Sequence, residues 1–275
     1  RAGRDAEALQ FWRDEYRLDA LIKRYRKPYV SIIDGAALGG GAGIAIHGSH
    51  RIAGDGFRFA MPEVGIGFFP DIGATWFLSR LAGEAGAYCA LTGERLEAAD
   101  ARALGIATHS VPSRRVPALL DGLCGAVPVD ALLAAFAEPA PGRPQLNRDA
   151  IDRLFGADRV EDILAALDAA GLAGGPDADF ARRAAATIRT KSPTSLKIAL
   201  AQLRRGKSLN FEACLRTEFR IVSRVATGHD FYEGIRAVIV DKDNSPRWRP
   251  PTLDAVSEAD VARYFAPVAD ELDLS

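Results

Sequence analysis

The chain has 275 residues, 48% of them hydrophobic, which is enough for one large domain or one domain with an appendage. Its formal net charge of −1 gives no electrostatic reason to expect nucleic acid or an anionic membrane as a partner. Three widely separated cysteines form neither a disulfide framework nor a zinc-ligand pattern, and they favour a reducing compartment.

The first half alternates short strand-like runs with helical ones. Residues 1–18 have the pattern of an amphipathic helix and not that of a signal peptide. Residues 28–34 are apolar and β-branched, which predicts a buried strand, and a glycine-rich turn and an apolar helix follow. Further strands are predicted at HRIAG, FRFAMP and IATHSVP, with helices that end at glycines between them. This alternation predicts a parallel sheet covered by helices.

From about Val116 onward almost every pattern is helical. Pro193 after Ser192 is typical of a helix start, and the Ser-x-x-Asp pattern at Ser257 is a capping signal. No internal repeat occurs in the sequence. We therefore expect an α/β core over residues 1–115, and a helical C-terminal region over residues 116–275 that packs on the core.

The run GAALGGGAG, residues 35–43, contains glycines that cost roughly 1 kcal/mol each against alanine inside a helix. A dinucleotide fingerprint is weak because there is no clean G-x-G-x-x-G, and no Gly-Lys-Ser/Thr follows that would indicate a P-loop. Close packing of the strand on the helix stays open as an explanation. An oxyanion site is equally open, because amides at a helix N-terminus lack internal partners and glycines let a carbonyl oxygen approach them.

Two carboxyl groups, Glu63 and Asp71, lie eight residues apart in the apolar segment 59–83. Each is flanked by proline or glycine, so each is expected on a turn. A carboxyl group in apolar surroundings has a raised pKa and can act as a base or carry a proton. Asp71 could instead cap a helix that begins near Ala74. For Glu63 a functional role is favoured.

Several segments together resemble the crotonase (enoyl-CoA hydratase/isomerase) superfamily and, within it, the 3-hydroxyisobutyryl-CoA hydrolases. In chain order they include FWRDEYRLDALI, KPYVSIIDG, ALGGGAG, MPEVGIGFFPDIG, LTGERLEAADARALGIATHSV, SPTSLKIALAQLRRG and GHDFYEGIRAVIVDKDNSPRWRP. The resemblance extends from about Phe11 to Pro250, and its last segment is one that ordinary hydratases lack. It implies an α/β fold with a crotonase-like spiral ββα core and a helical C-terminal region.

The resemblance also implies site residues. Gly40, the middle glycine of the triple, would donate its backbone N–H to the thioester oxygen, with Gly39 beside it at the substrate. Glu63 would be the catalytic carboxylate, as nucleophile or as general base, and Asp71 its companion. Glu15 would bind the hydroxyl of the acyl group. The implied reaction is hydrolysis of a short branched β-hydroxyacyl-CoA, first of all 3-hydroxyisobutyryl-CoA. Coenzyme A is part of the substrate, so we expect no cofactor and no metal.

Hydratases carry a second catalytic glutamate three positions after the middle glycine, where this chain has Gly43. The alternatives are an enoyl-CoA hydratase or dienoyl-CoA isomerase of the same fold, or a non-catalytic subunit that only binds acyl-CoA. Family members have a stretch upstream of Arg1, with a loop that gives the second oxyanion N–H. We therefore expect that the chain is a fragment or that another polypeptide supplies this loop.

The expected partner is an acyl-CoA substrate, without nucleic acid or membrane. The family suggests a homo-oligomer. The expected location is the cytoplasm, or the mitochondrial matrix in a eukaryote.

Overall fold

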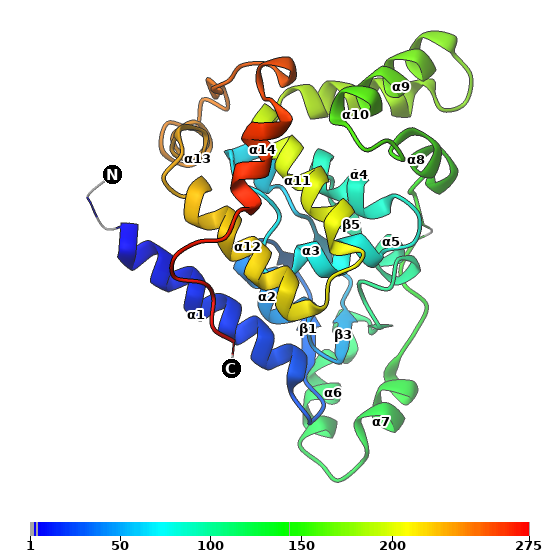
Figure 1. The fold of residues 1–275 in the computed structure, drawn as a ribbon. Helices are drawn as coiled ribbons and strands as arrows, with labels where there is room; N and C mark the ends of the chain where they lie inside the picture. Colours follow the sequence, from blue (N-terminus) through cyan, green and yellow to red (C-terminus); the bar gives the residue numbers. More distant parts are fainter. Residues whose placement is uncertain (1–2, 4, 143, 275) are drawn as a thin grey trace. The chain divides into compact units, whose positions relative to one another are not determined.

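The computed structural model describes residue 3 and residues 5–142 and 144–274 (Figure 1). The chain forms two compact units. The larger comprises Arg1–Arg17, Met61–Glu94 and Asn147–Ser275, and the smaller comprises Leu18–Ala60 and Arg95–Leu146. The units interleave along the chain, whereas the sequence patterns divide it once, near Val116. That single division stays a prediction.

The smaller unit holds two three-stranded sheets. The first has the order β1 (Val30–Ile33), β3 (His50–Ala53), β6 (His109–Ser110), and all its strands are parallel, as the alternation of strands and helices predicts. In the second, β4 (Arg58–Phe59) pairs in parallel with β2 (Ala36–Ala37) and antiparallel with β5 (Leu96–Glu97). Strands β2 and β5 were not predicted, because two residues are too few to show an alternating pattern.

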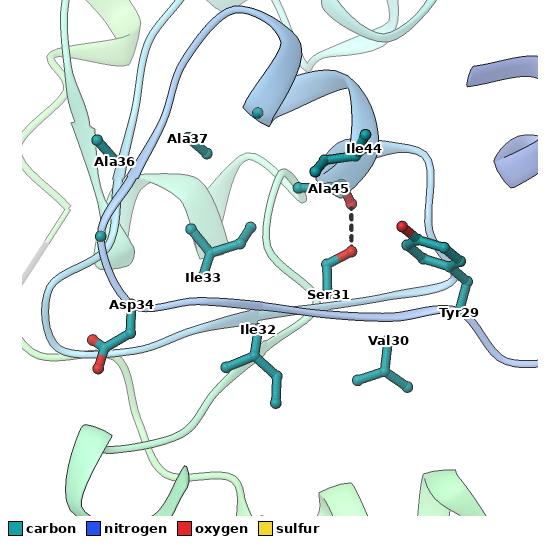
Figure 2. Close-up of a pocket in the computed structure, with 12 residues that line it drawn as sticks. Tyr29, Val30, Ser31, Ile32, Ile33, Asp34, Ala36, Ala37, Ile44 and Ala45 are labelled. Carbon is teal, nitrogen blue, oxygen red and sulfur yellow. Dashed lines mark hydrogen bonds between the residues drawn. The ribbon is translucent and has the colours of Figure 1, made fainter. Parts of the chain in front are cut away.

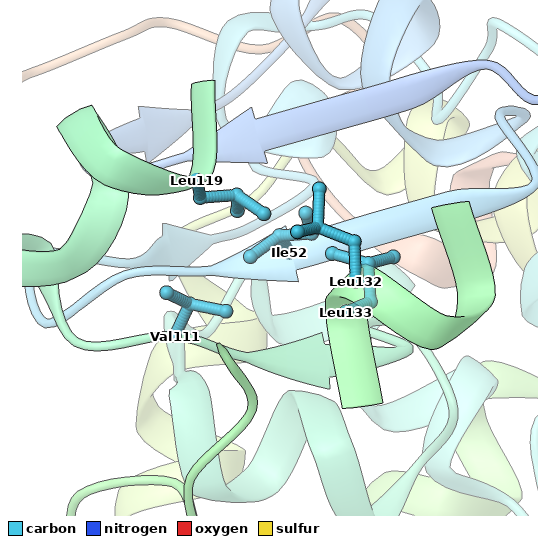
Figure 3. Close-up of a cluster of buried hydrophobic side chains, with 5 residues drawn as sticks. All are labelled: Ile52, Val111, Leu119, Leu132 and Leu133. Carbon is cyan, nitrogen blue, oxygen red and sulfur yellow. The ribbon is translucent and has the colours of Figure 1, made fainter. Parts of the chain in front are cut away.

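Helices α6 (Val116–Leu123) and α7 (Val129–Phe136) pack on the first sheet. Figure 3 shows the buried cluster that joins them, in which leucines from both helices meet Ile52 of β3. Its members are Ile52, Val111, Leu119, Leu132 and Leu133. Each buried leucine or isoleucine contributes roughly 1.5–3 kcal/mol. The remaining helices of this unit are α2 (Gly40–Ile46), α5 (Ala98–Ala103) and the 3₁₀ turn η3 (Ser113–Arg115).

The larger unit is helical, and no strand occurs among its described residues. Its long helices are α9 (Val160–Ala173), α10 (Ala178–Arg189), α11 (Pro193–Gly206) and α12 (Phe211–Val225), together with the first part of α1 (Asp5–Arg24). Its shorter ones are η1 (Glu63–Ile66), α3 (Ala74–Phe77), η2 (Leu78–Arg80), α4 (Ala85–Thr92), α8 (Arg148–Leu154), α13 (His229–Ile235), η4 (Arg236–Val240), η5 (Leu253–Ala255) and α14 (Glu258–Phe265).

Both predicted helix starts are confirmed. Ser192 caps α11 by accepting a hydrogen bond from the amide of Ser195, with Pro193 as the first helical residue. Ser257 and Asp260 form a complete capping box at α14. These starts were predictable because every partner in a cap lies within one turn of it.

Helix α13 packs tightly against η1, the turn that carries Glu63. A Cβ atom at Gly234 would collide with the backbone carbonyl of Ile66, and one at Gly67 would collide with that of Asp230. Gly67 also has a φ of 68°, which glycine adopts without strain. Glycines at these two positions therefore allow α13 to cover the Glu63 turn.

Candidate functional site

Glu63 lies at the start of a short 3₁₀ turn whose ends are set by its neighbours. Pro62 precedes the turn as its N-cap, and Gly67 closes it in the left-handed conformation. The Glu63 side chain is only 5% exposed. The motif thus places a carboxyl group on a short turn, away from solvent.

The environment of Glu63 favours its protonated form. Burial raises the pKa of Glu63 to about 8, and only a backbone hydrogen bond opposes this rise. Within the described chain, Oε2 is buried and has no hydrogen-bond partner. Once ionised, such a carboxylate is a stronger base than an exposed glutamate, and it has a lone pair free for a ligand.

Asp71 faces a hydroxyl group from α1. Its Oδ2 accepts a hydrogen bond of 2.9 Å from the Tyr16 hydroxyl, and both side chains are buried. Burial, followed by the charges of Glu63, Glu218 and Glu15, raises the pKa of Asp71 well above its usual range, although the Tyr16 bond opposes this. These surroundings therefore favour the protonated form of Asp71.

The alternative that Asp71 caps a helix is wrong. Helix α3 begins after Gly73. Because its N-cap residue is a glycine, this residue has no side chain that could cap the helix. A distant carboxylate takes this role. Glu218, on α12, accepts hydrogen bonds from the amides of Gly73 (2.7 Å, to Oε2) and Thr75 (2.8 Å, to Oε1).

Glu15 and Tyr16 are neighbours on α1. The Glu15 side chain is half-buried, and burial raises its pKa. Tyr16 is fully buried, and burial together with the Asp71 carboxylate raises the pKa of its hydroxyl well above 10. Tyr16 therefore stays a hydrogen-bond donor to Asp71. It was not predicted, because its position in the RDEY motif does not indicate a partner 55 residues later.

Glu218 was also missed, although the sequence carries a signal for it. On α12 the buried residues Phe211, Leu215, Glu218, Val222 and Val225 follow one another at helical spacing, so Glu218 interrupts an apolar stripe. An acid at such a position needs partners, and the structure gives it two backbone amides. Burial raises the pKa of Glu218 to about 7, while these bonds lower it.

The larger unit thus gathers an acidic cluster of Glu15, Glu63, Asp71 and Glu218. Among the residues that the structure describes, no lysine, arginine or histidine forms an ion pair with any of them. Like charges in a buried cluster disfavour each other, so the four groups cannot all ionise near neutral pH. At least one of the four carboxyl groups therefore stays protonated, and a cluster that holds such a proton is suited to proton transfer.

The two predicted glycines lie in the smaller unit. Gly39 has a φ of 52° and precedes α2, whose first residue is Gly40. The amides of Gly41 and Ala42 bond to Leu38 and Gly39, whereas the Gly40 amide has no acceptor in the described part of the chain. Gly40 is solvent-exposed.

A hollow of about 320 Å³ lies beside this turn, between β1 and α2 (Figure 2). Figure 2 shows the Ser31 hydroxyl donating a hydrogen bond of 3.1 Å to the carbonyl of Ala45, which ties strand to helix. A Cβ atom at Gly35, Gly39 or Gly41 would meet nothing within 4 Å. Close packing therefore does not explain Gly35, Gly39 or Gly41, and the φ of 52° at Gly39 is one that glycine adopts without strain.

The described residues contain no group of three histidine, cysteine or acidic side chains arranged to hold a metal ion. They also contain no helix that is long and apolar enough to cross a membrane.

Comparisons with known proteins agree with the motifs. The enoyl-CoA hydratase/isomerase family model matches residues 1–265. A mitochondrial 3-hydroxyisobutyryl-CoA hydrolase from Danio rerio is 42% identical over 275 residues, which cover 96% of this chain and 70% of the relative.

Two crystal structures share the fold. A carnitinyl-CoA dehydratase from Mycobacterium thermoresistibile has a TM-score of 0.91 at 46% identity, covering 99% of this chain and 77% of its own. An enoyl-CoA hydratase from Rhodobacter sphaeroides 2.4.1 has a TM-score of 0.85 at 37% identity, covering 97% of this chain and 76% of its own. The expected crotonase-like fold is thereby confirmed, and the chain belongs to the enoyl-CoA hydratase/isomerase (crotonase) family.

Proposed function

We propose that this protein hydrolyses 3-hydroxyisobutyryl-CoA, a short branched β-hydroxyacyl thioester, to the free acid and CoA. The observation that carries the proposal is that Glu63, which is buried with an unpartnered oxygen, and Asp71, which is buried and accepts a hydrogen bond from the Tyr16 hydroxyl, belong to one acidic cluster. Thioester hydrolysis needs one group that acts on the acyl carbon and another that protonates the departing sulfur. The identity to a 3-hydroxyisobutyryl-CoA hydrolase supports the same reaction.

In the proposed reaction ionised Glu63 acts on the acyl carbon in one of two ways. As nucleophile, it forms an anhydride while the C–S bond breaks and Asp71 gives its proton to the sulfur. Water then cleaves the anhydride, releasing the acid and returning a proton to Asp71. As general base, Glu63 takes a proton from the attacking water, and this proton later replaces the one that Asp71 gave to the sulfur. Both routes consume one water and end with the starting protonation states.

The remaining predicted residues have binding roles in this proposal. The Gly40 amide donates a hydrogen bond to the thioester oxygen, with Gly39 beside it, and Glu15 accepts a hydrogen bond from the substrate hydroxyl. No cofactor or metal takes part, since CoA arrives as part of the substrate. A homo-oligomer, a lack of nucleic-acid and membrane partners, and a location in the cytoplasm or the mitochondrial matrix stay predictions.

A second candidate activity is addition of water to an enoyl-CoA or its reverse. It is favoured by the names of the two solved structures, a carnitinyl-CoA dehydratase and an enoyl-CoA hydratase. Against it, the position at which hydratases carry their second glutamate is Gly43, a buried residue of α2 without a side chain. Hydrolysis is supported instead by the nearness of Glu63 to Asp71, whose pKa the Glu63 charge raises.

The deciding experiment follows free thiol released from 3-hydroxyisobutyryl-CoA and from isobutyryl-CoA, and hydration of crotonyl-CoA in parallel. We expect thiol release to be fastest with the hydroxylated substrate. In Glu15→Gln this preference should shrink roughly 10-fold or more, because a half-buried carboxylate left without its hydroxyl partner loses a hydrogen bond that it would otherwise make. Hydration of crotonyl-CoA without thiol release would instead establish the second candidate.

The Gly40 amide can be removed without adding a bulky side chain. Gly40 is the first residue of α2, where proline is tolerated because its missing N–H has no helical partner. We expect Gly40→Pro to lower kcat by about 10²–10³-fold, the usual cost of one oxyanion donor. Gly40→Ala keeps the N–H and is the matched control. Equal activity in the two variants would remove the amide from the mechanism.

A further inference from the structure

We infer that Glu218 is a positioning residue for the hydrolysis: it clamps the turn that carries Asp71 and places a negative charge beside it. This inference rests on the proposed function. Glu218 does not belong to the sequence motifs, and it acts through Asp71 without touching the acyl group.

The turn after Asp71 has a conformation that needs an external restraint. Ile72 has a φ of 55° and Gly73 a φ of 82°, so two successive residues are left-handed. For a β-branched residue this conformation costs on the order of 1–3 kcal/mol and persists only where the surroundings impose it. Ile72 is buried, so it cannot relax toward solvent.

Two side chains hold this turn from opposite ends. Gln202 of α11 donates a hydrogen bond of 2.5 Å to the carbonyl of Pro70, just before Asp71. Glu218 accepts hydrogen bonds from the amides of Gly73 and Thr75, which follow Asp71. Bonds from amides to a carboxylate are about twice as strong as neutral ones. Gln202 and Glu218 together therefore hold the backbone on both sides of Asp71, and this fixes the direction in which the Asp71 side chain points.

A cap alone does not explain a charged group at this place. Helix α3 is a single turn, Ala74–Phe77, and an uncharged cap contributes roughly 1 kcal/mol. Burying a carboxylate without a cation costs several kcal/mol. An uncharged side chain would cap the turn at lower cost, so the charge of Glu218 has a further role.

That role is to keep the proton on Asp71. The ionisable groups around Asp71 are Tyr16 and Glu15 of α1, Glu63 of η1 and Glu218 of α12, and all three carboxylates raise its pKa. Near Glu218 itself lie Tyr16 and the Cys214 thiol, whose pKa is raised to about 12 by burial and by Glu218. The Tyr16 hydroxyl and the Cys214 thiol are neutral at pH 7, Arg80 is the cation that acts on Cys214, and Glu218, whose pKa is about 7, is partly ionised there. Asp71 is thereby kept as the acid that protonates the departing sulfur.

The test compares Glu218→Gln with Asp230→Asn. Asp230 is a matched control, because it is a buried carboxylate of the same unit whose two oxygens also accept separate bonds, from the Ser192 hydroxyl and the Arg249 amide. Asp230 is not among the groups that shift the pKa of Asp71. In Glu218→Gln we expect kcat to fall about 10–100-fold with KM within threefold of wild type, as for loss of a proton donor's alignment.

A second measurement does not depend on turnover. Titration of ¹³C-carboxyl aspartate by NMR, with Asp71→Asn used for assignment, reports the Asp71 pKa directly. Without the negative charge of Glu218 the midpoint should move to lower pH, by about one unit, and the alkaline limb of kcat should move with it. Asp230→Asn should change neither. A wild-type midpoint in Glu218→Gln overturns the inference.

Glu218→Asp covers the case in which Glu218→Gln does not fold. It keeps the charge and shortens the side chain by one methylene, so the Asp71 midpoint should stay near that of wild type while kcat falls. Wild-type kcat in this variant overturns the positioning role. If wild type releases no thiol from any acyl-CoA, the proposed function fails, whereas the NMR titration still decides whether Glu218 and Asp71 are coupled.

Discussion

Replacement of Glu63 by glutamine is expected to lower kcat for thioester hydrolysis by about 10³-fold or more, because an amide is neither a nucleophile nor a base toward an acyl carbon. The substitution keeps the size of a side chain that is only 5% exposed, so the turn between Pro62 and Gly67 should remain. Thiol release from 3-hydroxyisobutyryl-CoA at saturating substrate measures the effect. In wild type, kcat/KM should rise with pH toward about 8, as Glu63 loses its proton.

A second active-site variant and a control variant accompany this measurement. Asp71→Asn should lower kcat by about 10²-fold, because CoA thiolate can leave without protonation, but more slowly. Glu233→Gln is the control, since Glu233 pairs with Arg236 at 2.8 Å and no member of the acidic cluster is among the groups that shift its pKa. Near-normal rates in both Glu63→Gln and Asp71→Asn would end the thioesterase proposal.

The same Glu63 substitution is expected to stabilise the protein at alkaline pH. Burial raises the pKa of Glu63 from 4.5 to about 8, so the folded state holds a proton that the unfolded state has lost. Its stabilising contribution is complete below pH 4.5 and disappears as pH rises toward 8. Over this range the free energy of unfolding of wild type should fall by about 5 kcal/mol relative to Glu63→Gln.

Urea denaturation from about pH 5 to about pH 9 measures this difference. Glu233→Gln is again informative, because the Arg236 guanidinium lowers the pKa of Glu233 to about 2 and the group stays ionised in the folded state across the whole range. Its effect on stability should therefore hardly change with pH. A parallel pH dependence in wild type and Glu63→Gln would mean that the folded protein does not bury an ionisable Glu63.

Most of the secondary structure was predictable because its signals are local. Cap residues such as Ser192 and Ser257 bond within one turn of themselves, and strand β1 is an apolar run bounded by turn residues. Strands β2 and β5 have two residues each and are strands only because β4 lies between them. Their existence depends on pairing partners that are distant in sequence.

The features of the acidic cluster also fall into those set by neighbours in the chain and those set by distant residues. The sequence by itself determined that Glu63 and Asp71 stand on turns in apolar segments, since proline, glycine and their apolar neighbours are adjacent in the chain. Only the tertiary structure decided that Tyr16 bonds to Asp71 and that Glu218, not the Asp71 side chain, accepts hydrogen bonds from the amides of Gly73 and Thr75 at the start of α3. The physical reason is that a pKa or a hydrogen bond depends on which groups meet in space, and the groups that meet here come from η1, the Asp71 turn, α1 and α12.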